Sequence, residues 1–108
     1  MYNPYDYYYK QAKKTWFKAR SVFKLEEIDK KFKLFDKNIK TVLDIGCSPG
    51  SWIQYAHQVL KEPKIVGFDL KPTNLDLDNV FLYQQDVTDL DKVEKIFSEL
   101  EIKKFDLI

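Results

Sequence analysis

The sequence is poor in the residues that mark extracellular scaffolds and membrane proteins. It has one cysteine, Cys47, so no internal disulfide can form, which fits a reducing cytosol. No apolar run approaches the roughly 20 residues that a membrane span needs, and the first residues lack the apolar segment of a secretory signal. The chain has 108 residues, enough for one domain. We therefore expect a cytoplasmic domain and exclude a disulfide scaffold, a membrane protein and a multidomain enzyme.

Charge is distributed unevenly, although the net charge is only +1. Residues 1–40 carry eleven Lys or Arg against five Asp or Glu, whereas residues 41–108 carry seven Lys against twelve Asp or Glu. A basic arm beside an acidic body favours an anionic macromolecular partner for the arm. The alternative is the solvated face of a lysine-rich helix.

The apolar pattern predicts alternating helices and strands. Between Gln11 and Phe35 apolar residues recur every three or four positions, which predicts amphipathic helices with a break near Ala19 and Arg20. The expected strands are 41–45, 64–70 and 80–84, with a fourth beginning at 105, and the expected later helices are about 51–61 and 91–101. This alternation predicts an α/β fold with a parallel sheet and flanking helices. Because the fourth run reaches the last residue, we expect the chain to be part of a longer domain, truncated after its fourth strand.

The strongest local motif is DIGCSPGSW, residues 44–52, between an expected strand and an expected helix. Glycines let the backbone approach a ligand, and a helix N-terminus favours a negative group. The spacing of Gly46 and Gly50 differs from the G-x-G-x-x-G of dinucleotide-binding proteins, and Pro49 removes one N–H donor. The loop therefore suits a nucleoside with a carboxylate-bearing tail. The alternative is an ordinary glycine-bearing turn.

Two carboxylates follow the next strands. Asp69 lies 23 residues after Gly46 at the end of the second strand, where an acidic side chain can accept hydrogen bonds from ribose hydroxyls. Asp86 closes the third strand, where it could accept from an exocyclic amine of adenine. Each taken alone could equally cap a strand end. Together with the glycine motif, at the edge where parallel sheets bind ligands, they predict a nucleoside cofactor.

The segment ARSVFKLEEI at 19–28, followed by the motif at 44–52 and by Asp69, resembles the FtsJ (RrmJ) group of RNA ribose 2′-O-methyltransferases. The likeness runs over almost the whole chain, from about residue 7. It implies a Rossmann-like fold that uses S-adenosylmethionine, with Gly50 and Trp52 as loop contacts, Asp69 at the ribose and Asp86 at the adenine. The cofactor-binding residues we expect are Asp44, Gly46, Pro49, Gly50, Trp52, Asp69 and Asp86.

The resemblance also assigns a catalytic role to Lys24, which matches the first member of the family's Lys-Asp-Lys-Glu set. Cations near a ribose 2′-hydroxyl can steer it and favour loss of its proton. The other three members have no match here, and Asp106 lies at the start of a strand rather than at the catalytic position. We therefore expect little methyl transfer by these 108 residues alone.

The basic arm then becomes an expected RNA-contact surface, residues 1–40, ahead of the amino-terminal half of a methyltransferase domain, residues 41–108. The expected phosphate contacts are Lys13, Lys14, Lys18 and Arg20. A uridine of large-subunit rRNA is favoured as the target over an anticodon-loop ribose of tRNA. We expect a monomer with no membrane partner and no protein-held metal. The competing hypotheses are a catalytically silent nucleoside- or RNA-binding module and, less favoured, a nicotinamide-dependent oxidoreductase.

Overall fold

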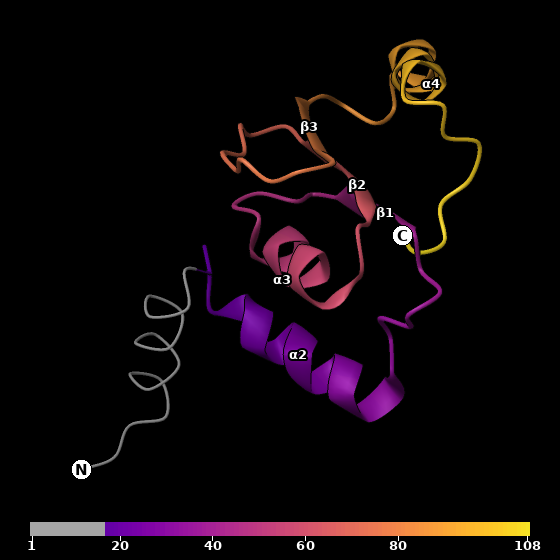
Figure 1. The fold of residues 1–108 in the computed structure, drawn as a ribbon. Coiled ribbons are helices and arrows are strands. Elements are labelled where there is room, and N and C mark those ends of the chain that lie inside the picture. The colour runs from indigo at the N-terminus through magenta and orange to yellow at the C-terminus, as the bar shows by residue number, and fades with distance from the viewer. Residues whose placement is uncertain (1–16) are drawn as a thin grey trace.

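The computed structural model describes residues 17–108, in which helices and strands alternate (Figure 1). The elements are α2 (Ser21–Phe32), β1 (Thr41–Ile45), α3 (Ser51–Val59), β2 (Lys64–Asp69), β3 (Val80–Gln84) and α4 (Leu90–Glu99). The strands lie where the apolar runs predict them, and α2 begins directly after the expected break. α3 ends earlier than predicted because Leu60 has extended backbone angles and Pro63 follows. Of the helix expected before Ala19, residues 11–16 lie outside the described residues, and residues 17 and 18 are not helical.

The sheet is parallel, in the order β1-β2-β3. Val42 of β1 pairs with Ile65 of β2 on one side and with Leu107 on the other. The fourth strand expected at 105–108 is thus reduced to a single bridge. Because α4 carries the chain from β3 to the far side of β1, the winding direction reverses at β1. The carboxyl end of a strand at such a switch point is where open α/β sheets bind ligands.

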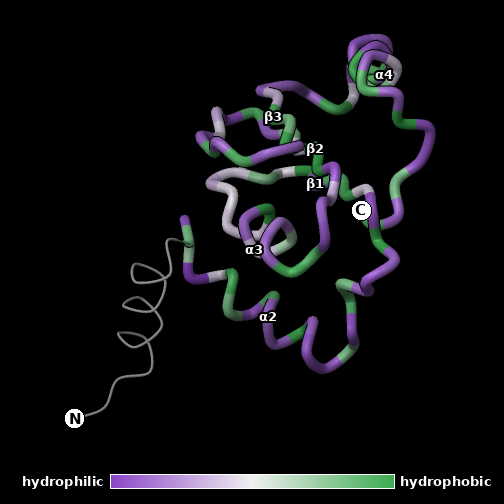
Figure 2. Tube along the Cα trace, viewed as in Figure 1, coloured by the Kyte–Doolittle hydropathy of each residue, from purple (hydrophilic) through white to green (hydrophobic). Residues whose placement is uncertain are grey.

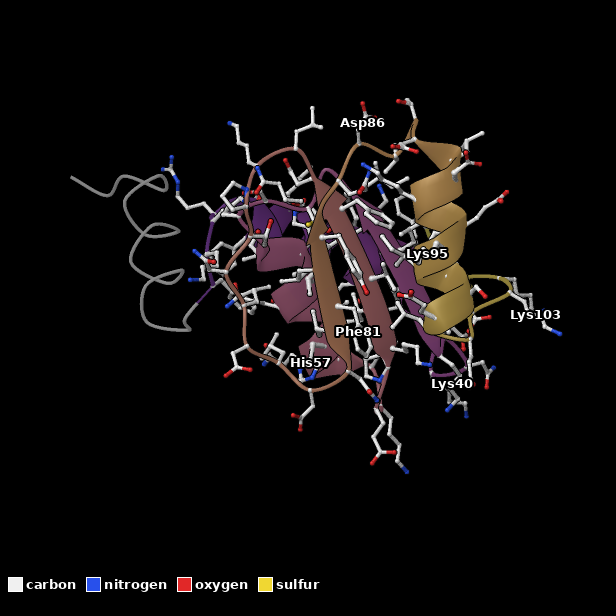
Figure 3. All side chains as sticks on the ribbon, turned by 90° about the horizontal axis from the view of Figure 1, so that it is seen from above. Lys40, His57, Phe81, Asp86, Lys95 and Lys103 are labelled. Atoms are coloured by element: carbon white, nitrogen blue, oxygen red, sulfur yellow. The ribbon has the colours of Figure 1, made fainter. Side chains whose placement is uncertain are left out.

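The sheet is covered on both faces, with α2 and α3 on one side and α4 on the other (Figures 1 and 3). Neighbouring residues of a strand point to opposite faces, so Val42 and Leu43 contribute to different cores. The cluster on the α3 side comprises Val42, Cys47, Ile53, Ala56, Leu60 and Ile65, and the cluster on the α4 side comprises Leu43, Val66, Phe68, Val93 and Ile102. Figure 2 shows the apolar strands between the more hydrophilic outer helices. Burial on both faces explains why the strands are nearly continuous apolar runs.

α2 packs against α3. Val22 and Leu25 of α2 are buried with Tyr55 of α3 in a third apolar cluster. At its far end the hydroxyl of Tyr55 donates to Asp29 Oδ2 at 2.7 Å, and the backbone N–H of Phe35 donates to Asp29 Oδ1 at 2.7 Å. The described part of the expected basic arm is therefore fixed against the helix that follows the glycine motif.

Candidate functional site

Two left-handed glycines shape the loop at residues 46–50, the glycine loop. The φ angle is 78° at Gly46 and 113° at Gly50, values that L side chains rarely adopt. The N–H groups of Gly46 and Cys47 donate to the carbonyl of Phe68, at 2.7 and 3.1 Å, so the loop turns over the carboxyl end of β2. A Cβ on Gly50 would lie 2.6 Å from Leu75 Cδ1, whereas one on Gly46 would meet nothing within 4 Å. A side chain at position 50 would therefore have to displace Leu75 as well as adopt an unfavourable backbone angle.

The glycine loop leads into the N-terminus of α3, where no side chain caps the helix. The first N–H groups of a helix have no partner within it and carry the positive end of its dipole. A cavity of about 290 Å³ adjoins this point. Its lining residues are Ser21, Asp44, Ile45, Gly46, Cys47, Ser48, Pro49, Ser51 and Trp52. Four of the expected cofactor-binding residues, Asp44, Gly46, Pro49 and Trp52, thus line one cavity.

Asp44 lies at the end of β1 with a half-buried carboxyl that has no hydrogen-bond partner among residues 17–108. Burial and, to a smaller extent, the negative charge of Asp69 raise the pKa of Asp44 to about 6. A cationic group in the cavity would counter both effects and favour the carboxylate. The geometry makes Asp44 the acidic wall of the cavity.

Asp69 braces the glycine loop. Its Oδ1 accepts the N–H of Lys71 at 2.8 Å and its Oδ2 accepts the N–H of Ser48 at 2.9 Å. These two hydrogen bonds lower the pKa of Asp69, so it is ionised at neutral pH. Each carboxylate oxygen can accept a second hydrogen bond. Asp69 can therefore brace the loop and still accept from a ligand hydroxyl.

Asp86 follows β3 at the same edge of the sheet (Figure 3). Its Oδ1 accepts both the N–H and the hydroxyl of Thr88, at 2.9 and 2.7 Å, and these bonds lower the pKa of Asp86. Asp86 therefore caps the end of β3, which is one of the two roles that the sequence allowed for it; the other is the adenine contact. Its Oδ2 has no partner within residues 17–108, so the expected adenine contact keeps an available acceptor.

The expected catalytic and RNA-binding residues lie on and before α2. The Lys24 side chain is 70% exposed, with Nζ 3.7 Å from Glu27 Oε2, and it does not line the cavity. Lys18 is exposed, and its backbone N–H donates to Gln54 Oε1 at 2.7 Å. Arg20 is the residue that precedes α2. Lys13 and Lys14 lie outside the described residues.

Asp106 is placed at the opposite edge of the sheet. Its Oδ2 accepts the N–H groups of Lys40 and Thr41, at 2.7 and 3.1 Å, where the chain enters β1. These hydrogen bonds lower the pKa of Asp106. Asp106 is therefore a structural cap at the end of the sheet where β1 begins, far along the strand from the glycine loop.

Two contributions to the site were missed in the sequence. Ser21 lines the cavity from the start of α2, with its Oγ 3.3 Å from Ser51 Oγ. Ser21 lies in the same segment as Lys24, and this position is the sequence feature that could have identified it. The loop after β2 packs on Gly50 through Thr73 and Leu75, and no local pattern marks these residues.

Residues 17–108 contain neither a metal-site cluster nor a membrane-spanning helix. No group of three or more His, Cys, Asp or Glu in that range could hold a metal ion. None of the helices in that range is long and apolar enough to cross a membrane.

Curated relatives share the name ribosomal RNA large subunit methyltransferase E. The protein of Bdellovibrio bacteriovorus is 52% identical over 99 residues, which cover 91% of this chain and 50% of that protein. The protein of Methanocaldococcus jannaschii is 37% identical over 108 residues, or 95% of this chain and 43% of that protein. This chain therefore spans about half the length of the relatives that it matches.

The fold and the family agree with these relatives. A crystal structure from Plasmodium falciparum, described as that of a ribosomal RNA methyltransferase, superposes with a TM-score of 0.68 and 33% identity, covering 84% of this chain and 54% of that one. This confirms the predicted Rossmann-like methyltransferase fold. The sequence profile of FtsJ-like methyltransferases matches residues 17–108. The chain belongs to the FtsJ-like methyltransferase family.

Proposed function

We propose that this chain binds S-adenosylmethionine at the glycine loop and serves the 2′-O-methylation of a ribose in RNA. One observation carries the proposal: a single cavity adjoins the N-terminus of α3, which no side chain caps, and is also lined by Asp44. The N-terminus of α3 favours an anion, and the side chain of Asp44 favours a cation. The amino-acid tail of S-adenosylmethionine carries both a carboxylate and an ammonium group, so the residues present fit this cofactor.

We assign the nucleoside part of the cofactor to the carboxyl ends of β2 and β3. Asp69 keeps acceptor capacity after bracing Ser48 and Lys71, which suits ribose hydroxyls. Asp86 uses only its Oδ1 to cap Thr88, which leaves Oδ2 for the adenine amine. Because β2 and β3 are adjacent and parallel, both carboxylates follow strands that end at the same edge.

Lys24 is the candidate catalytic residue of this chain. The cofactor, when bound, supplies an electrophilic methyl group. Lys24 lies in the first turn of α2, three residues after Ser21, which lines the cavity. From there its ammonium group would orient a ribose hydroxyl and favour loss of its proton. Since the remaining Asp, Lys and Glu have no match in the sequence, binding without appreciable turnover is our expectation for this chain alone.

RNA is the proposed macromolecular partner. Lys18 and Arg20 lie just before α2 and Lys24 lies in its first turn. Cationic side chains on a surface of this kind can neutralise RNA phosphates. The names of the relatives favour large-subunit rRNA as the target, and the family resemblance favours a uridine within it. The segment around Lys24 also suits an anticodon-loop ribose of tRNA, and competition between the two RNAs for the chain distinguishes the targets.

A calorimetric titration with S-adenosylmethionine tests the proposal. We expect the wild-type chain to bind and Asp69→Asn to weaken binding at least tenfold, because one acceptor oxygen and the charge are lost. Asp106→Asn is the matched control, since Asp106 also accepts backbone N–H groups but at the opposite edge. No binding by the folded wild-type chain, or equal loss in both variants, would contradict the assignment.

A further inference from the structure

The connection from β2 to β3, residues 70–79, lies against the glycine loop; we name it the strap (Figure 1). The contact is closest at Gly50, where a Cβ would lie 2.6 Å from Leu75 Cδ1 and 3.3 Å from Thr73 Cγ2. Two polar contacts accompany it. Cys47 Sγ lies 3.5 Å from Thr73 Oγ1, and the hydroxyl of Ser48 donates to the carbonyl of Pro72 at 3.4 Å. Three of the five residues of the glycine loop therefore touch the strap.

The strap is itself anchored at both ends. Near β2, Gln84 Nε2 donates to the carbonyl of Leu70 at 3.0 Å. Near β3, His57 Nε2 donates to the carbonyl of Asp78 at 3.1 Å, and Figure 3 shows His57 beside this end of the strap. Between the anchors, Leu75 packs on the buried cluster that includes Ile53 and Ala56 of α3. A segment fixed to β3, α3 and the core can hold a neighbouring loop in place.

The Gly50 end of the glycine loop needs such support, because the hydrogen bonds to Phe68 and Asp69 hold only Gly46, Cys47 and Ser48. Gly50 has φ of 113° and no side chain, so nothing intrinsic keeps it in that conformation. Gly50 also sets the direction of the first turn of α3, which has no side-chain cap. A loop that is free to move would have to be ordered when a ligand binds, at a cost in affinity.

We infer that the strap orders the glycine loop for its ligand, with Thr73 and Leu75 as positioning residues. This inference rests on the proposed function as far as the ligand is S-adenosylmethionine. Thr73 contributes through both branches of its side chain, the hydroxyl toward Cys47 and the methyl toward Gly50. Leu75 contributes by filling the space that a side chain at position 50 would take.

Leu75→Ala and Leu77→Ala form the matched pair of variants that tests the inference. Both truncate a half-buried leucine of the strap, but Leu77 is not among the nearest neighbours of Gly50. We expect Leu75→Ala to weaken the binding of S-adenosylmethionine about tenfold, and Leu77→Ala to leave it within about twofold. Titrations are run well below the unfolding midpoint of each variant, so that loss of fold does not enter the comparison.

Two substitutions of Thr73 form a second pair of variants, which change the structure less than truncation of a leucine does. Thr73→Val removes the hydroxyl and keeps the methyl, and Thr73→Ser does the reverse. We expect each to weaken binding about threefold, because each removes one of the two contacts with the glycine loop. The exposed neighbour Asn74, changed to Ala, should bind as the wild type does.

Hydrogen exchange of the ligand-free chain separates this inference from the proposed function. We expect the amides of residues 46–51 to exchange at least fivefold faster in Leu75→Ala than in Leu77→Ala. Equal exchange in the two variants would overturn the inference, and so would equal affinity if the wild type binds. If the wild type does not bind S-adenosylmethionine, the proposed function fails, while faster loop exchange in Leu75→Ala alone would still support ordering by the strap.

Discussion

At the scale of single residues, Asp44 is held where its charge is unfavourable. Burial and the neighbouring Asp69 raise its pKa to about 6, and no hydrogen bond within residues 17–108 stabilises its carboxylate. The usual pKa of an aspartate is near 3.8. The folded protein therefore binds a proton at Asp44 more tightly than the unfolded chain, and ionised Asp44 destabilises the fold above about pH 6. An unfavourable charge kept at a cavity wall is typical of a binding residue.

Asp44→Asn should separate stability from binding. At pH 7.5 we expect the free energy of unfolding to rise by about 1–2 kcal/mol, because the unfavourable charge is gone. Below pH 4 the gain should vanish, since Asp44 is then protonated in both states. Denaturant unfolding at the two pH values measures this difference.

The same residue should give cofactor binding a pH dependence. Affinity of the wild type for S-adenosylmethionine should fall as the pH drops through about 6, whereas Asp44→Asn should bind weakly at every pH. Titrations between pH 5 and 8 measure it. If Asp44→Asn proves more stable and binds as tightly as the wild type, Asp44 is not part of the site.

The two glycines of the loop should respond differently to alanine. Gly46→Ala meets open space and suffers only from its positive φ, which costs about 1 kcal/mol. Gly50→Ala adds a clash with Leu75, so we expect a loss above about 2 kcal/mol and weaker cofactor binding. Chemical denaturation of both variants provides the comparison. Equal losses would contradict the packing of the strap on Gly50.

Sequence alone defined the residues of the glycine loop but not their neighbours. The spacing of Gly46, Pro49 and Gly50 is local and could be interpreted directly. Ser21 and Leu75 reach the loop only through tertiary packing, and no local pattern reports that. Asp69 and Asp86 were each expected to contact a ligand or cap a strand, and the structure shows the capping contacts in both.

At the scale of elements, the pair α2–α3 connects the basic surface to the glycine loop. Polar contacts join the helices at both ends: Ser21 with Ser51 beside the cavity, and Asp29 with Tyr55 at the far end. Burial and Asp29 raise the pKa of Tyr55, which therefore stays protonated and donates. Lys24 lies between these contacts, so its helix cannot shift without breaking one of them.

Tyr55→Phe tests the far contact. It removes the hydroxyl that donates to Asp29 at 2.7 Å while keeping the buried ring, so we expect a loss of about 1–2 kcal/mol in unfolding free energy. Lys30→Ala is the control, because it removes only an exposed ion pair with Glu26 and should cost under about 0.5 kcal/mol. If both variants unfold at the same denaturant concentration, the Asp29 contact does not hold α2 in place.

Strands were predicted well wherever an apolar run is paired with a neighbouring strand, including β3, which has no fully buried residue. β1 and β2 are buried on both faces, so their apolar runs mark them directly. The fourth run, at 105–108, is equally apolar, but only Leu107 forms a bridge with β1. Strand pairing needs partners on the neighbouring strand, and hydrophobicity alone does not supply them.

At the scale of the whole molecule, α2 and α4 lie on opposite sides of the sheet (Figure 1). α2, with Lys18 and Arg20 just before it and Lys24 in its first turn, lies on one side of the sheet, while α4 lies on the other (Figure 1). An RNA attracted to the basic side would approach the same side as the cavity at the start of α2. The chain spans about half the length of its relatives, and the basic surface and the glycine loop both fall within that half.

Charge reversal on the two sides should therefore have unequal effects on RNA binding. Lys18→Glu with Lys24→Glu should weaken binding and reduce the slope of log affinity against log salt by about 1 to 2. Lys95→Glu with Lys103→Glu, on the α4 side (Figure 3), changes net charge equally and should have a much smaller effect. Equal slopes for the two double variants would show that net charge, not the α2 surface, governs binding.

The central claim is that S-adenosylmethionine binds at the glycine loop, and amide chemical shifts test it most directly. An NMR titration of the labelled chain should shift the amides of residues 44–48, 50–52, 69–71 and 85–88, which surround the cavity and the two strand-end carboxylates. The amides along the middle of α4 should stay unchanged. Saturable shifts confined to α4, or no shifts at millimolar cofactor, would contradict the account.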